Sequence, residues 1–144
     1  MQVVQILNSK GRAVLSIAPE ASVAEALSML AEHDIGALLV RDSGGEVCGI
    51  LSERDIVRAL AGGNASCLGE PVRTLMSTDL VCCQPDDSID SVMALMTGRR
   101  VRHLPVMNED RLLGLISIGD VVKHRMEEVQ REAAAMREYI SAAS

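Results

Sequence analysis

Two short motifs contain side chains whose types and spacing could support the binding of a nucleotide. They are Ser52-Glu53-Arg54-Asp55 and Ser117-Ile118-Gly119-Asp120, each at the expected start of a helix. A helix N-terminus presents free N–H groups and the positive end of the helix dipole, which suit a phosphate. An aspartate in the first turn could accept hydrogen bonds from both hydroxyls of a ribose. The same spacing also defines a capping box, in which the side chains satisfy the N–H groups of the helix itself. The two interpretations are compatible.

A cationic cluster is the third feature with possible chemistry. The segment Arg99-Arg100-Val101-Arg102-His103-Leu104-Pro105-Val106 places three arginines and a histidine within five residues, in a chain of formal net charge -6. An apolar, strand-like run follows at once, and charges cannot enter a core without partners. A bound anion would explain the cluster, and so would a solvated helix end. Because Pro105 has no N–H, we expect the strand to have a free edge or an irregular start there.

The composition favours one globular core and argues against several classes of partner. The chain has 144 residues, of which 48% are hydrophobic and 24% charged, as in globular proteins. Tyr139 is the only aromatic residue, so single-stranded nucleic acid would find no stacking platform, and we expect no nucleic-acid partner. No apolar run approaches the ~20 residues of a membrane span, and no export signal is recognisable. We therefore expect a cytoplasmic protein without membrane contact.

The cysteines and histidines do not form a metal site or a catalytic set in the sequence. Cys48, Cys67, Cys82 and Cys83 make no C-x-x-C pair and have no zinc spacing with histidine, so we expect reduced thiols and no metal. His33 and His124 lie on helix patterns, and we expect them at surface or edge positions. The serines lack a His/Asp relay, and no cysteine has a basic activator nearby, so we expect no enzymatic activity.

Most of the chain is an internal repeat, and the repeat determines the expected fold. Residues recur 66 positions later up to the turn and 65 positions later after it; the matches include Pro19 with Pro85, Ser22 with Ser88, Gly49 with Gly114, Ser52 with Ser117 and Asp55 with Asp120. Each copy has the pattern β-α-β-β-α, with capped amphipathic helices and hairpin spacing. We predict an α+β fold with two units related by a pseudo-twofold axis. The first domain is expected to span residues 1–65 and the second residues 66–144.

A long helix is expected from about residue 120 to 142. Its apolar residues follow a heptad pattern, which defines a seam at Val122, Met126, Val129, Ala133, Met136 and Ile140. A helix of this length extends beyond what one small module can bury, which predicts a homodimer. The alternative is that the helix folds back on Val3 to Leu7 of its own chain, and both could hold together.

The repeat, the two Ser-x-x-Asp motifs and the string Val101–Val106 resemble a tandem pair of cystathionine-β-synthase (CBS) domains, also called a Bateman module. The resemblance covers roughly residues 3 to 126. Gly36–Val40 together with Gly49–Asp55 resembles the stand-alone bacterial members. It implies the binding of adenine nucleotides in clefts between the two domains. By this resemblance Asp55 and Asp120 hold the ribose hydroxyls, and Ser52 and Ser117 assist at the ribose or the phosphate.

The resemblance also places the phosphate and the base. Arg102 and His103 occupy the position of phosphate-binding cations, and Arg54 and Arg100 are further candidates. Adenine would lie between aliphatic side chains and bond to the backbone near Ile35-Gly36-Ala37 and near Arg102-His103. The first copy has Gly36-Ala37 where the second has Arg102-His103, and Arg54 where the second has Gly119. The two sites should therefore not be equivalent.

The implied function is a regulatory or sensor module. It would take AMP, ATP or an NAD-type compound as a regulatory ligand, would require no cofactor, and would signal energy or cofactor state to a regulated protein that the sequence does not identify. The competing hypothesis is a dimerisation or scaffold module with vestigial clefts, although the presence of both Asp55 and Asp120 argues against it. A third hypothesis is a redox or metal sensor that uses Cys82 and Cys83.

Overall fold

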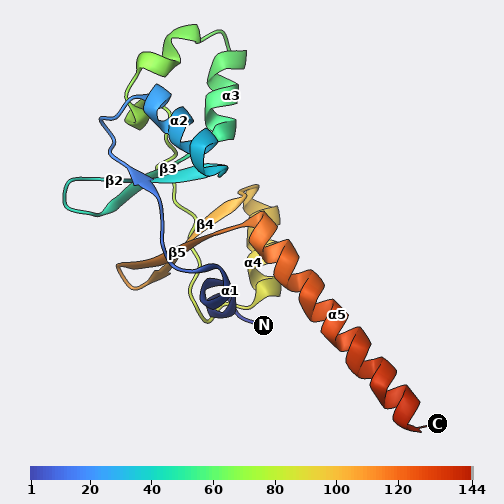
Figure 1. Ribbon diagram of the computed structural model, residues 1–144. Coiled ribbons are helices and arrows are strands. Elements are labelled where there is room, and N and C mark those ends of the chain that lie inside the picture. Colours follow the sequence, from blue (N-terminus) through green and yellow to red (C-terminus); the bar gives the residue numbers. More distant parts are fainter. Residues whose placement is uncertain (144) are drawn as a thin grey trace. The chain divides into compact units, whose positions relative to one another are not determined.

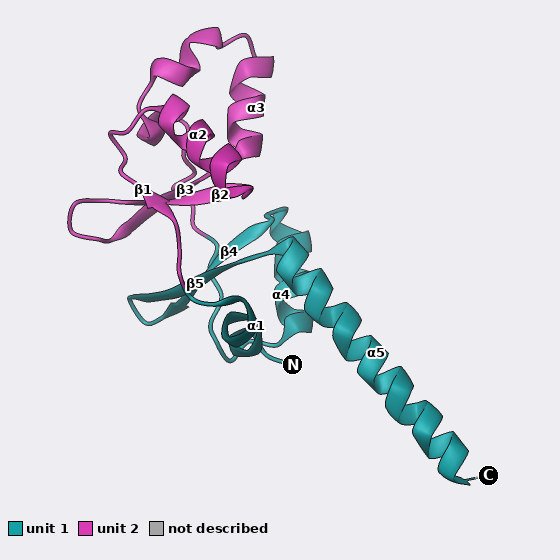
Figure 2. Cartoon of the chain, viewed as in Figure 1, with its two compact units in different colours: residues 1–12, 81–144 teal, residues 13–80 magenta. Residues whose placement is uncertain are grey.

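A computed structural model describes residues 1–143, which form two compact units (Figures 1 and 2). Unit 1 contains residues 1–12 together with 81–144, and unit 2 contains residues 13–80. The N-terminal segment therefore packs with the second repeat, and the segment that follows the first repeat packs with the first. The compact units thus differ from the division of the sequence at residue 65, which stays a prediction about the two repeats.

Unit 2 is built around a three-stranded sheet of order β1-β2-β3. Its main elements are β1 (Ser16–Ile17), α2 (Val23–His33), β2 (Ala37–Arg41), β3 (Val47–Ser52) and α3 (Glu53–Ala61), followed by the 3-10 helices η1 (Ala65–Gly69) and η2 (Val72–Thr74). Strand β1 is parallel to β2, and β2 is antiparallel to β3. The core is aliphatic, as the composition predicted; it contains Ile17, Val23, Ala26, Leu30, Leu38, Val40, Leu51, Ile56 and Val72.

Unit 1 contains a two-stranded antiparallel sheet, β4-β5, and three helices. Its elements are α1 (Val3–Lys10), α4 (Ile89–Arg99), β4 (His103–Asn108), β5 (Arg111–Ser117) and α5 (Ile118–Ala143). Helix α1 precedes the first repeat in sequence but supplies core residues to the second. The core contains Val3, Ile6, Leu7, Cys83, Ile89, Val92, Met96, Leu104, Val106, Ile116 and Val121.

Local sequence signals explain how the helices in the two repeats begin and end. The Ser22 Oγ accepts a hydrogen bond from Glu25 N at 3.1 Å, and the Ser88 Oγ accepts one from Ser91 N at 3.0 Å. Both helices end in a left-handed residue, Asp34 with φ 52° and Arg100 with φ 54°, which redirects the chain towards the next strand. The α+β fold with two repeats and a long C-terminal helix is confirmed.

The first strand of the second repeat is reduced to a single parallel bridge between Cys83 and Val106. Cys83 N donates to Pro105 O at 3.0 Å, and Met107 N donates to Cys83 O at 2.8 Å. The next bond of this ladder would need an N–H at Pro105, which proline lacks. The repeat places Leu39 at the equivalent position in unit 2, where β1 pairs over two residues. The irregular edge predicted from Pro105 is therefore present.

Two equivalent glycines show that each hairpin is closely approached by a segment preceding a repeat. A Cβ on Gly114 would lie 2.6 Å from Leu7 Cδ2, which belongs to α1. A Cβ on Gly49 would lie 2.6 Å from Met76 Sδ and 3.0 Å from Ser77 O. Ser77 also bridges Ile50. In both hairpins the glycine permits a close packing contact that a side chain would block.

Helix α5 packs within unit 1 only over its first turns. Val121 and His124 are buried, whereas every described residue from 131 onward is exposed. The expectation for His124 was wrong: it is 6% exposed, and its Nδ1 lies 3.0 Å from Asp120 O. It lies three residues after Val121, on the same helix face. In the described chain, residues 1–143, no helix combines the length and apolar character needed to cross a membrane.

Candidate functional site

Each unit brings its Ser-x-x-Asp motif beside the start of its own hairpin. In unit 2, Ala37 at the start of β2 pairs with Ser52 at the end of β3. In unit 1, His103 at the start of β4 pairs with Ser117 at the end of β5. The chain then turns into α3 or α5. The hairpin register therefore gathers Ile35, Gly36 and Ala37 near Ser52–Asp55 in unit 2, and Arg102 and His103 near Ser117–Asp120 in unit 1.

In unit 2 the motif forms a capping box. Ser52 N donates to Asp55 Oδ2 at 2.9 Å, Ser52 Oγ lies 3.0 Å from the same oxygen, and Asp55 N donates to Ser52 Oγ at 3.2 Å. Glu53 N donates to Gly36 O at 2.9 Å. All these carboxylate contacts use Oδ2. No residue in the described chain, 1–143, donates to Asp55 Oδ1, so this oxygen can accept from a ligand.

In unit 1 the same backbone pattern recurs with an added cation. Ser117 N donates to Asp120 Oδ2 at 2.9 Å, and Asp120 N donates to Ser117 Oγ at 3.1 Å. Ile118 N donates to Arg102 O at 2.8 Å. In addition, Lys10 Nζ lies 2.6 Å from Asp120 Oδ2 and donates to Leu115 O at 2.9 Å. The ammonium group of Lys10 in α1 thus forms an ion pair with the carboxylate of Asp120 in α5.

These contacts change the expected role of the two helix N-termini. In α3 the N–H groups of Ser52, Glu53 and Asp55 are already bonded, and the equivalent groups of Ser117, Ile118 and Asp120 are bonded in unit 1. The sequence suggested free N–H groups for a phosphate, but the capping interaction takes most of them. A phosphate bound at either unit would therefore depend chiefly on cationic side chains.

The surroundings of Asp120 affect its ionisation. Burial is the largest single effect and opposes the charged form. The hydrogen bond from Lys10, the bonds from the Ser117 backbone and hydroxyl, and the charge of Lys10 act in the other direction, and together they hold the pKa of Asp120 below its ordinary value. Asp120 is therefore ionised at neutral pH and can act as a hydrogen-bond acceptor.

Lys10 was missed by the sequence reasoning. It is 110 residues away from Asp120 and lies at the end of helix α1, so no local spacing connects the two. The available signal was a weak echo of Val4–Leu7 in Val72–Leu75, which precedes both copies of the repeat.

The candidate phosphate-binding cations are distributed unequally between the two units. Arg102 is exposed and directly precedes β4, and its backbone carbonyl contacts α5. His103 is half-buried at the start of β4, and Arg100 is the exposed, left-handed cap of α4. In unit 2, Arg54 is exposed in the first turn of α3. The structure therefore places three of the predicted cations in unit 1 and one in unit 2.

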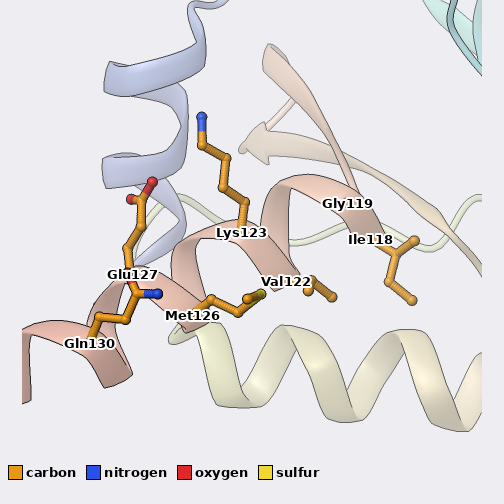
Figure 3. A pocket seen from close by; sticks show the side chains of 7 residues that line it. All are labelled: Ile118, Gly119, Val122, Lys123, Met126, Glu127 and Gln130. Carbon is orange, nitrogen blue, oxygen red and sulfur yellow. The ribbon is translucent and has the colours of Figure 1, made fainter. Parts of the chain in front are cut away.

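A shallow groove of about 590 Å³ lies along the first turns of α5 (Figure 3). It adjoins the Ser117–Asp120 motif but includes neither of these two residues. Its lining is mainly apolar, and all of it comes from α5: Ile118, Gly119, Val122, Lys123, Met126, Glu127 and Gln130.

The cysteines of unit 1 give little support to a thiol-based sensor. Burial, together with the nearby charges of Asp87 and Cys82, raises the pKa of Cys83 to about 12, and burial also raises the pKa of Cys82. Both thiols are therefore protonated and weakly nucleophilic at neutral pH. Within residues 1–143, no group of three or more His, Cys, Asp or Glu side chains is placed to hold a metal ion.

Comparison with known proteins identifies both repeats. Residues 10–62 and 72–127 match the family model of the CBS domain. A CBS-domain-containing protein from Agrobacterium tumefaciens, known as a crystal structure, is 46% identical, covering 86% of this chain and 92% of that chain with a TM-score of 0.84. The match therefore includes nearly the whole of a small bacterial protein.

Two more distant structures carry ligands. A CBS domain protein from Pyrobaculum aerophilum, complexed with AMP, is 24% identical with a TM-score of 0.73, covering 83% of this chain and 89% of that one. A CBS domain pair complexed with 5′-methylthioadenosine and S-adenosyl-L-methionine is 22% identical with a TM-score of 0.78, covering 89% and 98%. At these identities the similarity establishes a shared fold.

Proposed function

Because this chain belongs to the CBS domain family, as a tandem CBS pair similar to small bacterial proteins, we propose that it is a regulatory module for an adenosine-containing ligand. The observation that carries this proposal is the doubled Ser-x-x-Asp motif, in which each aspartate is oriented by its capping serine through Oδ2. Relatives of the same fold bind AMP or S-adenosyl-L-methionine, and adenosine is common to both ligands.

The aspartates are the proposed ribose ligands. A carboxylate has about four lone-pair sites, and the contacts within each unit use only Oδ2. The 2′- and 3′-hydroxyls of a ribose would donate to the remaining sites on Asp55 or Asp120, with Ser52 or Ser117 beside them. The adenine would bond to the backbone near residues 35–37 in unit 2 and near residues 102–103 in unit 1.

The phosphate is assigned to the arginines. Arg102 has an exposed guanidinium, which can hold a phosphate through two parallel hydrogen bonds. His103 and Arg100 are additional candidates in unit 1, and Arg54 is the candidate in unit 2. We expect AMP, ATP or an NAD-type compound to act as a regulatory ligand that alters a partner protein, with no cofactor required and no catalysis by this chain.

A homodimer through α5 is part of the proposal. The seam residues Val122, Met126, Val129, Met136 and Ile140 are between 43% and 60% exposed in the isolated chain. The heptad places Glu132 and Arg137 at flanking positions five residues apart, which suits charge pairing between two parallel helices. The same exposed seam is the observation that favours the alternative function, a scaffold whose ligand sites are vestigial.

Ligand binding by the purified protein tests the proposed function. Native mass spectrometry and thermal shifts would be measured with AMP, ADP, ATP, NAD, S-adenosyl-L-methionine and adenosine. A ligand at 100 times its Kd should raise the free energy of unfolding by about 2.7 kcal/mol. Asp55→Ala and Asp120→Ala should each remove one site. The proposal fails, and the scaffold is favoured, if none of these ligands binds at millimolar concentration.

The role of Arg102 is tested by calorimetry on Arg102→Ala. A hydrogen bond to a charged group contributes about 1.5–3 kcal/mol, so the affinity for AMP should fall roughly ten- to hundredfold. The affinity for adenosine, which has no phosphate, should change little. Unchanged AMP affinity at low salt would identify Arg102 as part of a solvated helix end.

Association through α5 is tested with two variants that add the same charge. Met136→Glu places a carboxylate in the seam, whereas Ala134→Glu places one outside it, two residues away. Light scattering should show a dimer for the unmodified chain and for Ala134→Glu, and a weakened dimer for Met136→Glu. A monomer of the unmodified chain at high concentration would contradict this part of the proposal.

A further inference from the structure

The ammonium group of Lys10 has an unused hydrogen-bond donor at the Asp120 carboxylate. A lysine ammonium carries three N–H donors. One contacts Asp120 Oδ2 at 2.6 Å, and a second is donated to Leu115 O at 2.9 Å. The Lys10 and Asp120 side chains are 36% and 23% exposed, so the pair is accessible to a ligand. The third donor can therefore reach a group that binds beside Asp120.

The pair presents two complementary groups side by side. Asp120 Oδ1 receives no hydrogen bond from any residue in the described range 1–143, so it can accept from a hydroxyl. Lys10 can donate to an anion and adds a positive charge. A ligand with a ribose hydroxyl and a phosphate matches both groups, whereas an uncharged nucleoside uses only the first. A cationic ligand would meet repulsion from the ammonium.

Unit 2 lacks this arrangement. In the part of the chain that the structure describes, no lysine or arginine forms an ion pair with Asp55, whose contacts are all with Ser52. The weak echo between residues 4–7 and 72–75 places Thr78 at the position equivalent to Lys10, and threonine carries no charge. The two aspartates thus differ in local charge although their capping contacts are alike.

From these contacts we propose that Lys10 is a ligand-contacting residue of unit 1 that selects phosphorylated over unphosphorylated adenosine. This inference rests on the proposed function of Asp120 as a ribose ligand and goes beyond it by assigning the selectivity to a residue of helix α1, 110 residues away in the sequence. The preferred ligand class of unit 1 is an adenosine phosphate monoester. Unit 2, whose aspartate has no such lysine partner among residues 1–143, is expected to discriminate less between AMP and adenosine.

Calorimetry with adenosine and 5′-AMP tests the proposal in a chain carrying Asp55→Asn, which silences unit 2 while keeping an oxygen acceptor for Ser52 N. Lys10→Met should lower the ratio of AMP affinity to adenosine affinity by about tenfold, as expected for the loss of one charge-assisted bond. Lys10→Arg should keep most of the selectivity. Titrations with 2′-AMP and 3′-AMP show which phosphate position Lys10 serves.

The chain offers a matched control, because Lys123 is its only other lysine. Lys123→Met removes the same charge from α5, in a side chain that lines the groove (Figure 3) and has no contact with Asp120. It should leave the AMP-to-adenosine ratio unchanged. Amine labelling followed by mass spectrometry gives an independent measurement: AMP should protect Lys10 from modification more than Lys123.

The outcomes separate the two proposals. If the Asp55→Asn chain binds neither ligand, both the proposed ribose site of unit 1 and the role of Lys10 are overturned. If it binds AMP, but Lys10→Met changes both affinities equally, or Lys123→Met has the same effect, only the role of Lys10 is overturned. Circular dichroism on each variant shows whether the fold is retained, and Lys10→Arg keeps the test valid if Lys10→Met does not fold.

Discussion

Unit 1 and unit 2 contain the same capped helix start, but different segments complete it. In both units a serine and an aspartate three residues apart share the same backbone hydrogen bonds, within 0.1 Å for the bond to Oδ2. Within residues 1–143, a lysine, Lys10 of α1, contacts the carboxylate in unit 1, and no lysine contacts it in unit 2. The repeated motif thus determines the backbone geometry, whereas the charge at each site depends on which other segment packs against it.

The largest expected difference between the units is the loss of stability when a hairpin glycine is replaced by alanine. Gly114→Ala should lower the free energy of unfolding by about 1–3 kcal/mol, the usual cost of overpacking. The added Cβ would meet Leu7, which is 1% exposed and packed in the core of unit 1. Gly49→Ala should cost less, because the atom closest to its Cβ is Sδ of the half-buried, flexible Met76. The Ser77 backbone oxygen, 3.0 Å from that Cβ, still makes the substitution destabilising. Urea denaturation of both variants gives the comparison.

Hydrogen exchange shows where each change acts. Gly114→Ala should increase exchange in α1 and β5, and Gly49→Ala should increase it in β3. Equal destabilisation by the two substitutions would mean that α1 is as adaptable as residues 76–77, and would contradict the tighter packing inferred for unit 1.

The second difference concerns how much each aspartate contributes to the stability of the ligand-free protein. Asp55→Ala removes the acceptor of Ser52 N and should cost about 1 kcal/mol. Asp120→Ala removes the equivalent bond and also the ion pair with Lys10, a partly exposed contact that contributes up to about 1 kcal/mol more. The melting temperature of Asp120→Ala should therefore be lower than that of Asp55→Ala. Asp120→Ala in a chain that already carries Lys10→Met controls for the ion pair, because only the bond to Ser117 is then lost. A reversed ranking of the two single variants would contradict the contribution of the ion pair.

The smallest expected effect is on acid stability. The pKa of Asp120 is lower in the folded chain than its ordinary value. Its contribution to stability is therefore present above the ordinary aspartate pKa of ~3.9 and is lost as the pH falls through the lower folded pKa. Lys10→Met should raise the pKa of Asp120, which carboxyl NMR measures directly, and should shift acid unfolding slightly upward in pH. An unchanged pKa would show that the Ser117 bonds alone hold the carboxylate charged.

Sequence reasoning located the parts of the fold that depend on nearby residues. The caps at Ser22, Ser88 and Ser52 act over three residues, so their spacing was readable directly. The irregular edge at Pro105 follows from its missing N–H, a property of the residue itself. Because the two copies share one sequence pattern, an assignment made in one unit could be applied to the other.

The parts that were missed depend on contacts between distant segments. The composition of unit 1 and the burial of His124 follow from how α1 and α5 pack into one core. The contact between Lys10 and Asp120 spans 110 residues. No short-range pattern in the sequence reveals these features, because each depends on how one element packs against another. The roles of the site residues in ligand binding stay predictions.

The N-terminal segment packs with the second repeat, and this has a consequence for synthesis on the ribosome. Residues 1–12 emerge before unit 2, but their packing partners begin at residue 81. Unit 2 is one continuous stretch and can complete its contacts as soon as residue 80 has emerged, and domains generally fold as units during translation. Helix α1, whose Val3, Ile6 and Leu7 are fully buried in the finished protein, must wait with an exposed apolar face. Residues 1–12 are therefore made before unit 2 but fold after it, and a pause in translation near residue 80 would prolong the period in which they can be captured by a chaperone.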